Sequence, residues 1–263
     1  MPRKCLYLPS IHLFAAIIFI SFFSKRTKKG VRMDSNTPPF KIILGSKSKA
    51  RREIMVEMGY EFTIMTANID EKAIRKEKPE DLVMALAEAK ADAIISKLQI
   101  ADKQVNDSEP TLLISADTAE ATLTKPSNGD LRTDAGPSIL ITGDQVVVYE
   151  GMIREKPSSK EEARQYLKDY SGRKASTLSS VLVTNLQTGF RKGEWDKVEI
   201  LFDEIPDETI EKLIEEGEVL HVAGGLIIEH PLILPLVKQV VGTTDSVMGL
   251  PKAVTERLIA DSL

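Results

Sequence analysis

Cysteine is nearly absent from this sequence of 263 residues, in which Cys5 is the only one. The chain after Cys5 therefore has no disulfide, no cysteine-ligated metal and no cysteine nucleophile. Its stability must come from a packed core, which a hydrophobic content of 42% is sufficient to build. A chain without disulfides suits a reducing compartment, so we expect a cytoplasmic protein.

Acidic residues are absent from Met1–Met33, which carries seven basic residues. Its apolar run Leu13–Phe23 is short for a membrane span, although extension back to Cys5 gives a marginal span or the core of a signal peptide. We treat residues 1–39 as a separate segment. It is a membrane anchor, an organelle-targeting peptide or upstream sequence from a mis-assigned start, and contact of residues 1–33 with a membrane stays an open alternative.

The rest of the chain is acidic, with 28 basic and 39 acidic residues and hence a formal charge of −11. Nucleic-acid polymers need a basic face, so they are not expected as partners. The P-loop, G-x-G-x-x-G and G-x-S-x-G motifs are all missing. This disfavours P-loop kinases, dehydrogenases and α/β-hydrolases.

The sequence from Lys41 to Met55 predicts a strand that runs through Gly45-Ser46 into a helix. Unpaired N–H groups at a helix start attract anions, and Ser46, Arg51 and Arg52 add donors for phosphate oxygens. The alternative is a purely structural turn capped by Ser48. The local pattern alone does not choose between them.

Two nearly identical stretches follow a helix expected over residues 79–98 and a polar loop over 101–109. They are Pro110–Thr118, which contains Asp117, and Pro137–Gln145, which contains Asp144. Only the second continues into a β-branched run, so we assign Ser138–Tyr149 to the core as one strand. Residues 110–136 are then an inserted or duplicated segment.

The remaining chain alternates helices and strands, which predicts an α/β fold with a mixed sheet. Helices are expected over 160–170, from 206 to about 217 and from 251 onward, and strands over 177–185 and 195–202.

Asp144 is the strongest acid candidate, because ligands of α/β proteins bind at the ends of buried strands. Asp70 and Glu71 could help to hold a divalent ion, although their spacing alone favours a solvated acidic loop. Lys156, before Pro157, offers a cation on a rigid loop, and its bland alternative is an ordinary surface lysine.

Eight ordered blocks between residue 40 and the C-terminus together resemble the Maf family of nucleoside triphosphate pyrophosphatases. The blocks are Leu-Gly-Ser-x-Ser-x-x-Arg-Arg (44–52), Asp70-Glu71, Ala-Glu-Ala-Lys-Ala (87–91), Gly-Asp-Gln-Val-Val (143–147), Lys156-Pro157, Ser171-Gly172, Ala-Gly-Gly (223–225) and Gly-Leu-Pro (249–251).

The resemblance implies a two-lobed, Maf- and ITPase-like α/β fold with a central cleft in residues 40–263. It implies a homodimer that cleaves a nucleoside triphosphate to the monophosphate and pyrophosphate with Mg²⁺ or Mn²⁺. Asp144 matches the proton acceptor, and Glu71 with Asp144 would hold the metal. The residues expected on the phosphate side are Ser46, Arg51, Arg52, Lys90 and Lys156.

Base choice is expected to depend on Ala50, Gln145 and Glu229. Ala50 is small where the family commonly has arginine or tryptophan. Gln145 and Glu229 look like the subgroup that acts on 7-methyl-GTP, since a carboxylate can accept the N–H groups of a guanine edge. The alternatives are a dTTP/UTP pyrophosphatase and a nucleotide-binding regulator of cell division without turnover.

Overall fold

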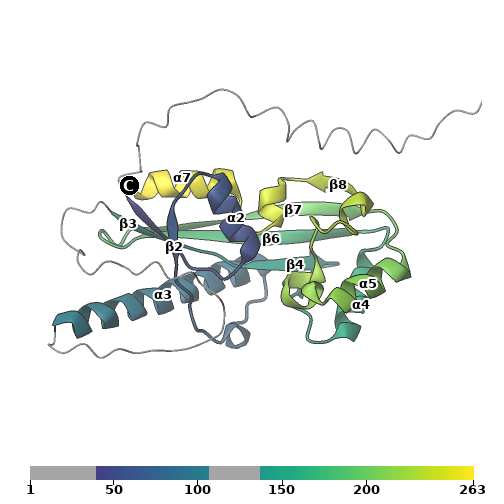
Figure 1. The fold of residues 1–263 in the computed structure, drawn as a ribbon, viewed down its shortest axis with the longest axis horizontal. Coiled ribbons are helices and arrows are strands. Elements are labelled where there is room, and N and C mark those ends of the chain that lie inside the picture. The colour runs from purple at the N-terminus through teal and green to yellow at the C-terminus, as the bar shows by residue number, and fades with distance from the viewer. Residues whose placement is uncertain (1–39, 107–136) are drawn as a thin grey trace, which may run out of the picture. The chain divides into compact units, whose positions relative to one another are not determined.

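The computed structural model of this chain describes residues 40–106 and 137–263, and these residues form a single α/β unit (Figure 1). The strands are β1 (Lys41–Leu44), β2 (Phe62–Ile64), β3 (Ser138–Thr142), β4 (Gln145–Tyr149), β5 (Met152–Arg154), β6 (Lys174–Asn185), β7 (Arg191–Phe202) and β8 (Val237–Val241). The α-helices are α2 (Lys49–Glu57), α3 (Pro79–Asn106), α4 (Lys160–Tyr170), α5 (Asp207–Glu216), α6 (Thr244–Val247) and α7 (Lys252–Ser262). Short 3₁₀ turns are η2 (Glu71–Ala73), η3 (Glu218–His221), η4 (Ala223–Gly225) and η5 (Leu234–Leu236).

One mixed sheet of eight strands organises the unit, with the order β2-β1-β3-β6-β4-β5 and with β7 pairing both β6 and β8. β1 runs parallel to β2 and β3, and the other pairings are antiparallel. The long β6–β7 hairpin connects the sheet, since β3 and β4 pair with β6 and β8 pairs with β7. The predicted α/β fold with a mixed sheet is confirmed.

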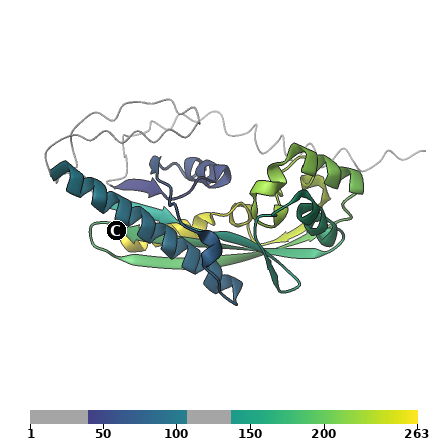
Figure 2. The same cartoon turned by 90° about the horizontal axis from the view of Figure 1, so that it is seen from below.

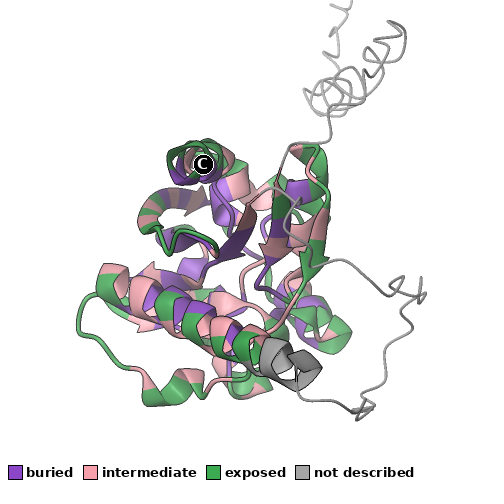
Figure 3. Cartoon of the chain, turned by 90° about the vertical axis from the view of Figure 1, so that its left-hand side faces the viewer, coloured by how far each residue is buried: buried purple, intermediate pink, exposed green. Residues whose placement is uncertain are grey.

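Helices cover both faces of β6 because its side chains alternate between them. Val181 and Val183 pack in one cluster with Leu258 of α7, whereas Leu182 packs with Ala91 of α3. α7 and α3 therefore lie on opposite faces, as Figures 1 and 2 show. In Figure 3 the central strands of the sheet are largely buried, as β3 and β6 are, and the outer side of α3 is exposed.

The buried side chains gather at the two ends of the β6–β7 hairpin. α4 and α5 pack at one end on Ala175 of β6 and Phe202 of β7. β1, α2 and α7 pack at the other end, on Val181 and Val183. These two groups of elements correspond to the predicted two lobes.

The strand predicted over residues 138–149 is interrupted at Gly143-Asp144, where β3 ends and β4 begins. Both pieces pair with the same edge of β6, β3 at Leu182–Asn185 and β4 at Ser176–Ser179. At the break the Ser180 N–H donates to the Asp144 carbonyl over 2.9 Å. The single strand was therefore wrong, but the slot given to this stretch in the core was right.

The polar loop expected from residue 101 was also wrong in part, since α3 continues to Asn106. No proline or glycine stops the helix there, and its charged residues are tolerated on a helix. β8 was not predicted. The separate segment 1–39 and the inserted segment 110–136, with Asp117, lie outside the described residues. Among the described helices, none combines the length and apolar character that a membrane crossing requires.

Candidate active site

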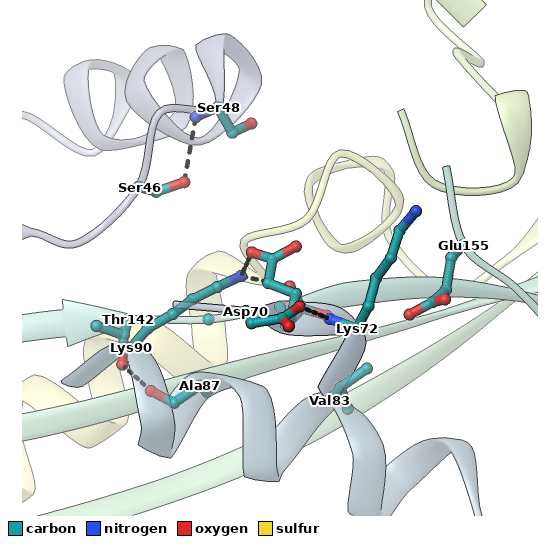
Figure 4. Close-up of polar contacts among 12 residues, drawn as sticks. Ser46, Ser48, Asp70, Lys72, Val83, Ala87, Lys90, Thr142 and Glu155 are labelled. Atoms are coloured by element: carbon teal, nitrogen blue, oxygen red, sulfur yellow. Dashed lines mark hydrogen bonds and ion pairs between the residues drawn. The ribbon is translucent and has the colours of Figure 1, made fainter. Parts of the chain in front are cut away.

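The loop between β1 and α2 places Ser46 and Ser48 at the start of α2. The Ser48 Oγ accepts from the Arg51 backbone N–H over 3.3 Å and caps the helix, as predicted. The Ser48 N–H donates in turn to the Ser46 Oγ over 3.2 Å (Figure 4). The two alternatives, a capped turn and a phosphate-binding loop, are therefore compatible. Ser48 caps the helix, and Ser46 faces Arg51.

Arg51 is buried, with 8% of its surface exposed, and its guanidinium joins three loops. Its Nε donates to the Gly249 carbonyl over 2.8 Å, and its Nη1 donates to the Gly143 carbonyl over 2.9 Å and to the Ser46 Oγ over 3.3 Å. Among the described residues its Nη2 has no hydrogen-bond partner. Burial lowers the pKa of Arg51, although the charges of Asp144 and Glu71 act in the opposite direction.

Lys90 of α3 brings two carboxylates together. Its Nζ lies 2.6 Å from Asp144 Oδ1 and 2.9 Å from Glu71 Oε1. Lys90 and Asp144 are mostly buried, and Glu71 is half exposed. The labelled Lys90 in Figure 4 extends from its helix toward these contacts. Residues separated by 54 positions in the sequence thus form one charged cluster.

Two side chains and a glycine fix the backbone that presents Asp144. Ser180 of β6 accepts the Asp144 N–H over 3.0 Å and donates its hydroxyl to the Val83 carbonyl of α3 over 2.8 Å. Thr142 similarly donates to Ala87 over 2.8 Å (Figure 4). Gly143 has no room for a side chain, because a Cβ there would lie 2.2 Å from the backbone carbonyl oxygen of Ser180. The sequence-based prediction missed Ser180, although two adjacent serines inside a buried strand are a signal for it.

Lys156 is exposed on the loop after β5, and its charge reaches Glu71. Burial acts to raise the pKa of Glu71, but the hydrogen bond and charge of Lys90, together with the charges of Lys156 and Arg51, outweigh it and lower the pKa. Ser46, Arg51, Lys90, Asp144, Glu71 and Lys156 therefore belong to one neighbourhood.

Of the other predicted residues, Gln145 borders the same site beside Arg51 and Gly249, whereas Ala50, Arg52 and Glu229 lie in different surroundings. Gln145 Nε2 donates to the Val247 carbonyl over 2.6 Å and to the Ser179 Oγ over 3.0 Å, which leaves its Oε1 as an acceptor. Ala50 lies in the first turn of α2. Arg52 lines a shallow hollow on the outer side of α2 with Lys49, Glu53, Val56 and Glu57, away from the Arg51 side. Glu229 is exposed on a turn after η4, and no polar contact joins it to Asp144 among the described residues.

The chemistry of Glu71 and Asp144 fits a divalent ion. Mg²⁺ is commonly bound by one or two carboxylates plus substrate phosphates and water. The two carboxylates approach the same lysine ammonium, so a cation already occupies the space between their oxygens. A cluster of three or more His, Cys, Asp or Glu side chains does not occur in residues 40–106 and 137–263. The remaining ligands would therefore come from the substrate.

Comparison with known protein families gives a match over nearly all of this unit. The model of the family described as Maf-like protein matches residues 41–135 and 130–262. This chain belongs to the Maf-like protein family. The resemblance carried by the eight sequence blocks is confirmed.

Relatives of this Maf-like chain carry names that describe nucleotide pyrophosphatases. A 7-methyl-GTP pyrophosphatase of Dictyostelium discoideum is 35% identical over 219 residues, which is 83% of this chain and 95% of the relative. A dTTP/UTP pyrophosphatase of Agathobacter rectalis is 29% identical over 81% of this chain and 92% of its own length. A nucleoside triphosphate pyrophosphatase of Salinispora tropica is 25% identical, with 86% of each chain covered.

Proposed function

We propose that this protein hydrolyses a nucleoside triphosphate to the monophosphate and pyrophosphate, with Asp144 as the proton acceptor. The observation that carries the proposal is the contact of Lys90 with both Asp144 and Glu71 beside the buried guanidinium of Arg51. Hydrolysis of a polyanion needs a carboxylate that can accept a proton from water and cations that can bind the phosphate oxygens. The names of the relatives support the same reaction class.

Arg51 would hold the triphosphate rather than react with it. Three of its five N–H donors are used within the protein, which fixes the plane of the guanidinium. The two donors on Nη2 can then point at one phosphate group, and the fixed plane means that little entropy is lost on binding. Lys90 and Lys156 supply the remaining positive charge, and the Ser46 hydroxyl can reorient toward a phosphate oxygen. Arg52, on the other side of α2, is the phosphate ligand with the least structural support.

The chemical step is the attack of a water molecule on the α-phosphorus. Asp144 orients the water and accepts its proton as the new P–O bond forms. The bond from the α-phosphorus to the bridging oxygen breaks, and pyrophosphate leaves with that oxygen and its electron pair. Lys90 and Arg51 stabilise the charge that develops on the phosphate oxygens, since they are held in place before the reaction. The ion pair with Lys90 also holds the Asp144 carboxylate in place beside Arg51.

Glu71 and Asp144 would hold a Mg²⁺ or Mn²⁺ ion. When bound, the ion would supply electrostatic stabilisation of the triphosphate charge. Dependence of activity on the added metal, measured after dialysis against a chelator, tests this part separately.

Pyrophosphate release from a panel of nucleotides tests the proposed reaction. Asp144→Asn should lower kcat by about 10²–10⁴-fold, which is the usual contribution of a general base, while nucleotide binding persists. Asp92→Asn is the matched control, because Asp92 lies on α3 and its one ion pair among the described residues is with Arg191 at the surface. Binding by the wild type without release of pyrophosphate with any nucleotide would instead support the regulator without turnover.

For the base we propose 7-methyl-GTP or another modified purine nucleotide, supported by the name of the relative that is 35% identical. Glu229 is exposed and can accept from a guanine edge, and Gln145 keeps a free acceptor. Glu229→Gln should then weaken hydrolysis of 7-methyl-GTP relative to UTP by about 1–3 kcal/mol. An unchanged ratio of kcat/KM for the two substrates would favour the dTTP/UTP alternative.

The homodimer and the cytoplasmic location are part of the same proposal. Both come from the resemblance and the cysteine content of the sequence. Sedimentation of the purified chain tests the first, and fractionation of cells that express a tagged full-length chain tests the second.

A further inference from the structure

Arg154 at the end of β5 is a buried arginine with no part in the reaction as described above. Its guanidinium carbon lies 4.5 Å from the ring centroids of Tyr149 and Tyr166 and 5.2 Å from that of Tyr170. Its Nη2 also donates to Asp169 of α4. Such a guanidinium is held by ring faces and a carboxylate together, so it ties β5 firmly to β4 and α4.

The loop that carries Lys156 starts immediately after Arg154, and Tyr170 helps to hold its first residue. The Tyr170 hydroxyl donates to the Gly224 carbonyl over 2.9 Å. The Gly224 N–H donates to the Glu155 carbonyl over 2.9 Å. Gly224 itself has no space for a side chain, because a Cβ would lie 2.8 Å from the Tyr170 hydroxyl.

Tyr166 holds the other end of the same loop. Its hydroxyl donates to Glu162 Oε1 over 2.9 Å. Glu162 Oε2 accepts from the Ser158 N–H over 2.6 Å and from the Ser158 hydroxyl over 2.7 Å. Pro157, between the two anchored ends, is buried. Two of the three rings around Arg154 are thus linked to the two ends of this loop. Tyr170 is linked to Glu155 through Gly224, and Tyr166 is linked to Ser158 through Glu162.

We propose that Arg154 is a positioning residue, which acts through Tyr166 and Tyr170 to hold the Lys156 ammonium at the phosphate-binding cluster. This inference rests on the proposed function, in which Lys156 binds the triphosphate. Lys156 is exposed, so its own side chain has many conformations available. A loop that is anchored at both ends restricts the Lys156 side chain to conformations near Glu71. The charge of Lys156 acts to lower the pKa of Glu71.

A double-mutant cycle separates positioning from general stability. Arg154→Met should raise KM for the nucleotide about tenfold and change kcat less than twofold, because one charged contact becomes poorly placed. In a Lys156→Ala background the same substitution should have no further effect on KM. Arg154→Lys keeps a cation among the rings and should lie between the wild type and Arg154→Met. Equal factors in both backgrounds, or no change in KM, would overturn the proposal.

Two further measurements cover other outcomes. If Arg154→Met does not fold, Tyr166→Phe replaces it, since this variant keeps the ring but loses the bond to Glu162 and should raise KM about threefold only when Lys156 is present. Arg164→Met is the control, because Arg164 pairs with Glu211 at the surface of the same helix. Amide hydrogen exchange at Gly224 should be faster in the Arg154 variant, and unchanged exchange would count against the proposal even if no nucleotide were hydrolysed.

Discussion

Two arginines, Arg51 and Arg154, are buried in the part of the chain that the structure describes, and their charged groups have different kinds of partner. Arg154 has a carboxylate partner and three tyrosine rings around it. Burial acts to lower its pKa, but the bonds to Asp169 and Tyr170 outweigh this and raise it. Arg51 is bound by two backbone carbonyls and a serine hydroxyl, and burial lowers its pKa.

The difference lies in where the positive charge is balanced. The charge of Arg154 is neutralised by Asp169 in direct contact, so no ligand is needed. Within residues 40–106 and 137–263 the charge of Arg51 meets only neutral oxygens directly, and the carboxylates whose charges affect it, Asp144 and Glu71, are in contact with Lys90 instead. A buried cation with neutral partners gains most from an incoming anion. From this difference we infer a structural role for Arg154, and it supports the proposal that Arg51 binds the ligand.

The largest effect is expected at Arg51. Arg51→Lys keeps the charge but cannot bridge Ser46, Gly143 and Gly249 and also reach a phosphate, because lysine lacks the planar fork. We expect kcat/KM for pyrophosphate release to fall by about 10²–10³-fold, as when one oxyanion donor is removed. Arg154→Lys is the paired variant and should lose less. Retention of activity within threefold in Arg51→Lys would show that charge alone is sufficient there.

The next effect is on stability, at the partner of Arg154. Asp169→Ala leaves the guanidinium buried without a carboxylate and should lower the free energy of unfolding by about 1.5–3 kcal/mol. Glu211→Ala is the control, since Glu211 of α5 pairs with Arg164 of α4 at the surface, where solvent screens the pair, and this variant should lower the free energy of unfolding much less. Urea unfolding at pH 7 measures both. Equal losses would mean that the burial of Arg154 is not what makes its ion pair stabilising.

Local signals were sufficient to predict much of this arrangement. The strand and helix on either side of Gly45-Ser46 follow from an apolar run, a glycine and the capping residue Ser48, all adjacent in sequence. The helix that starts after Ser159 and the strands of the β6–β7 hairpin are equally local. Asp144 could be chosen because a buried apolar stretch precedes it.

The contacts that define the two arginines could not be predicted, because they join distant parts of the chain. Arg51 meets Gly143 and Gly249 across 92 and 198 residues. Whether an arginine faces carbonyls or a carboxylate depends on this packing and leaves no trace in local sequence. β8 was missed for a similar reason, since it is a short strand whose one partner among the described strands is β7.

A smaller effect is expected from acid at Glu71. Its pKa is lower in the folded protein, so its contribution to stability is present above its ordinary pKa, 4.5, and is lost as the pH falls through the lowered value. Glu71→Gln should therefore have a lower Tm than the wild type at pH 7, and the difference should shrink below about pH 4.5. The effect is modest because the side chain is half exposed. A difference in Tm that stays constant from pH 7 to pH 3 would contradict the pairing with Lys90.

The smallest effect is expected at Asp117, which lies outside the described residues. It occupies, in the first of the two near-duplicate stretches, the position that Asp144 occupies in the second. The second copy occupies the core: β3 pairs with both β1 and β6, and Val146 and Val147 after Asp144 are buried. Replacing this copy by the first would expose those valines, at a cost of about 1.5–3 kcal/mol each, and no gain from the polar residues after Asp117 would offset it. Asp117→Asn should therefore change pyrophosphate release by less than the error of the assay, and a chain in which Glu109 is joined to Pro137 should fold. An inactive Asp117→Asn beside an active Asp144→Asn would mean that the first copy provides the acid.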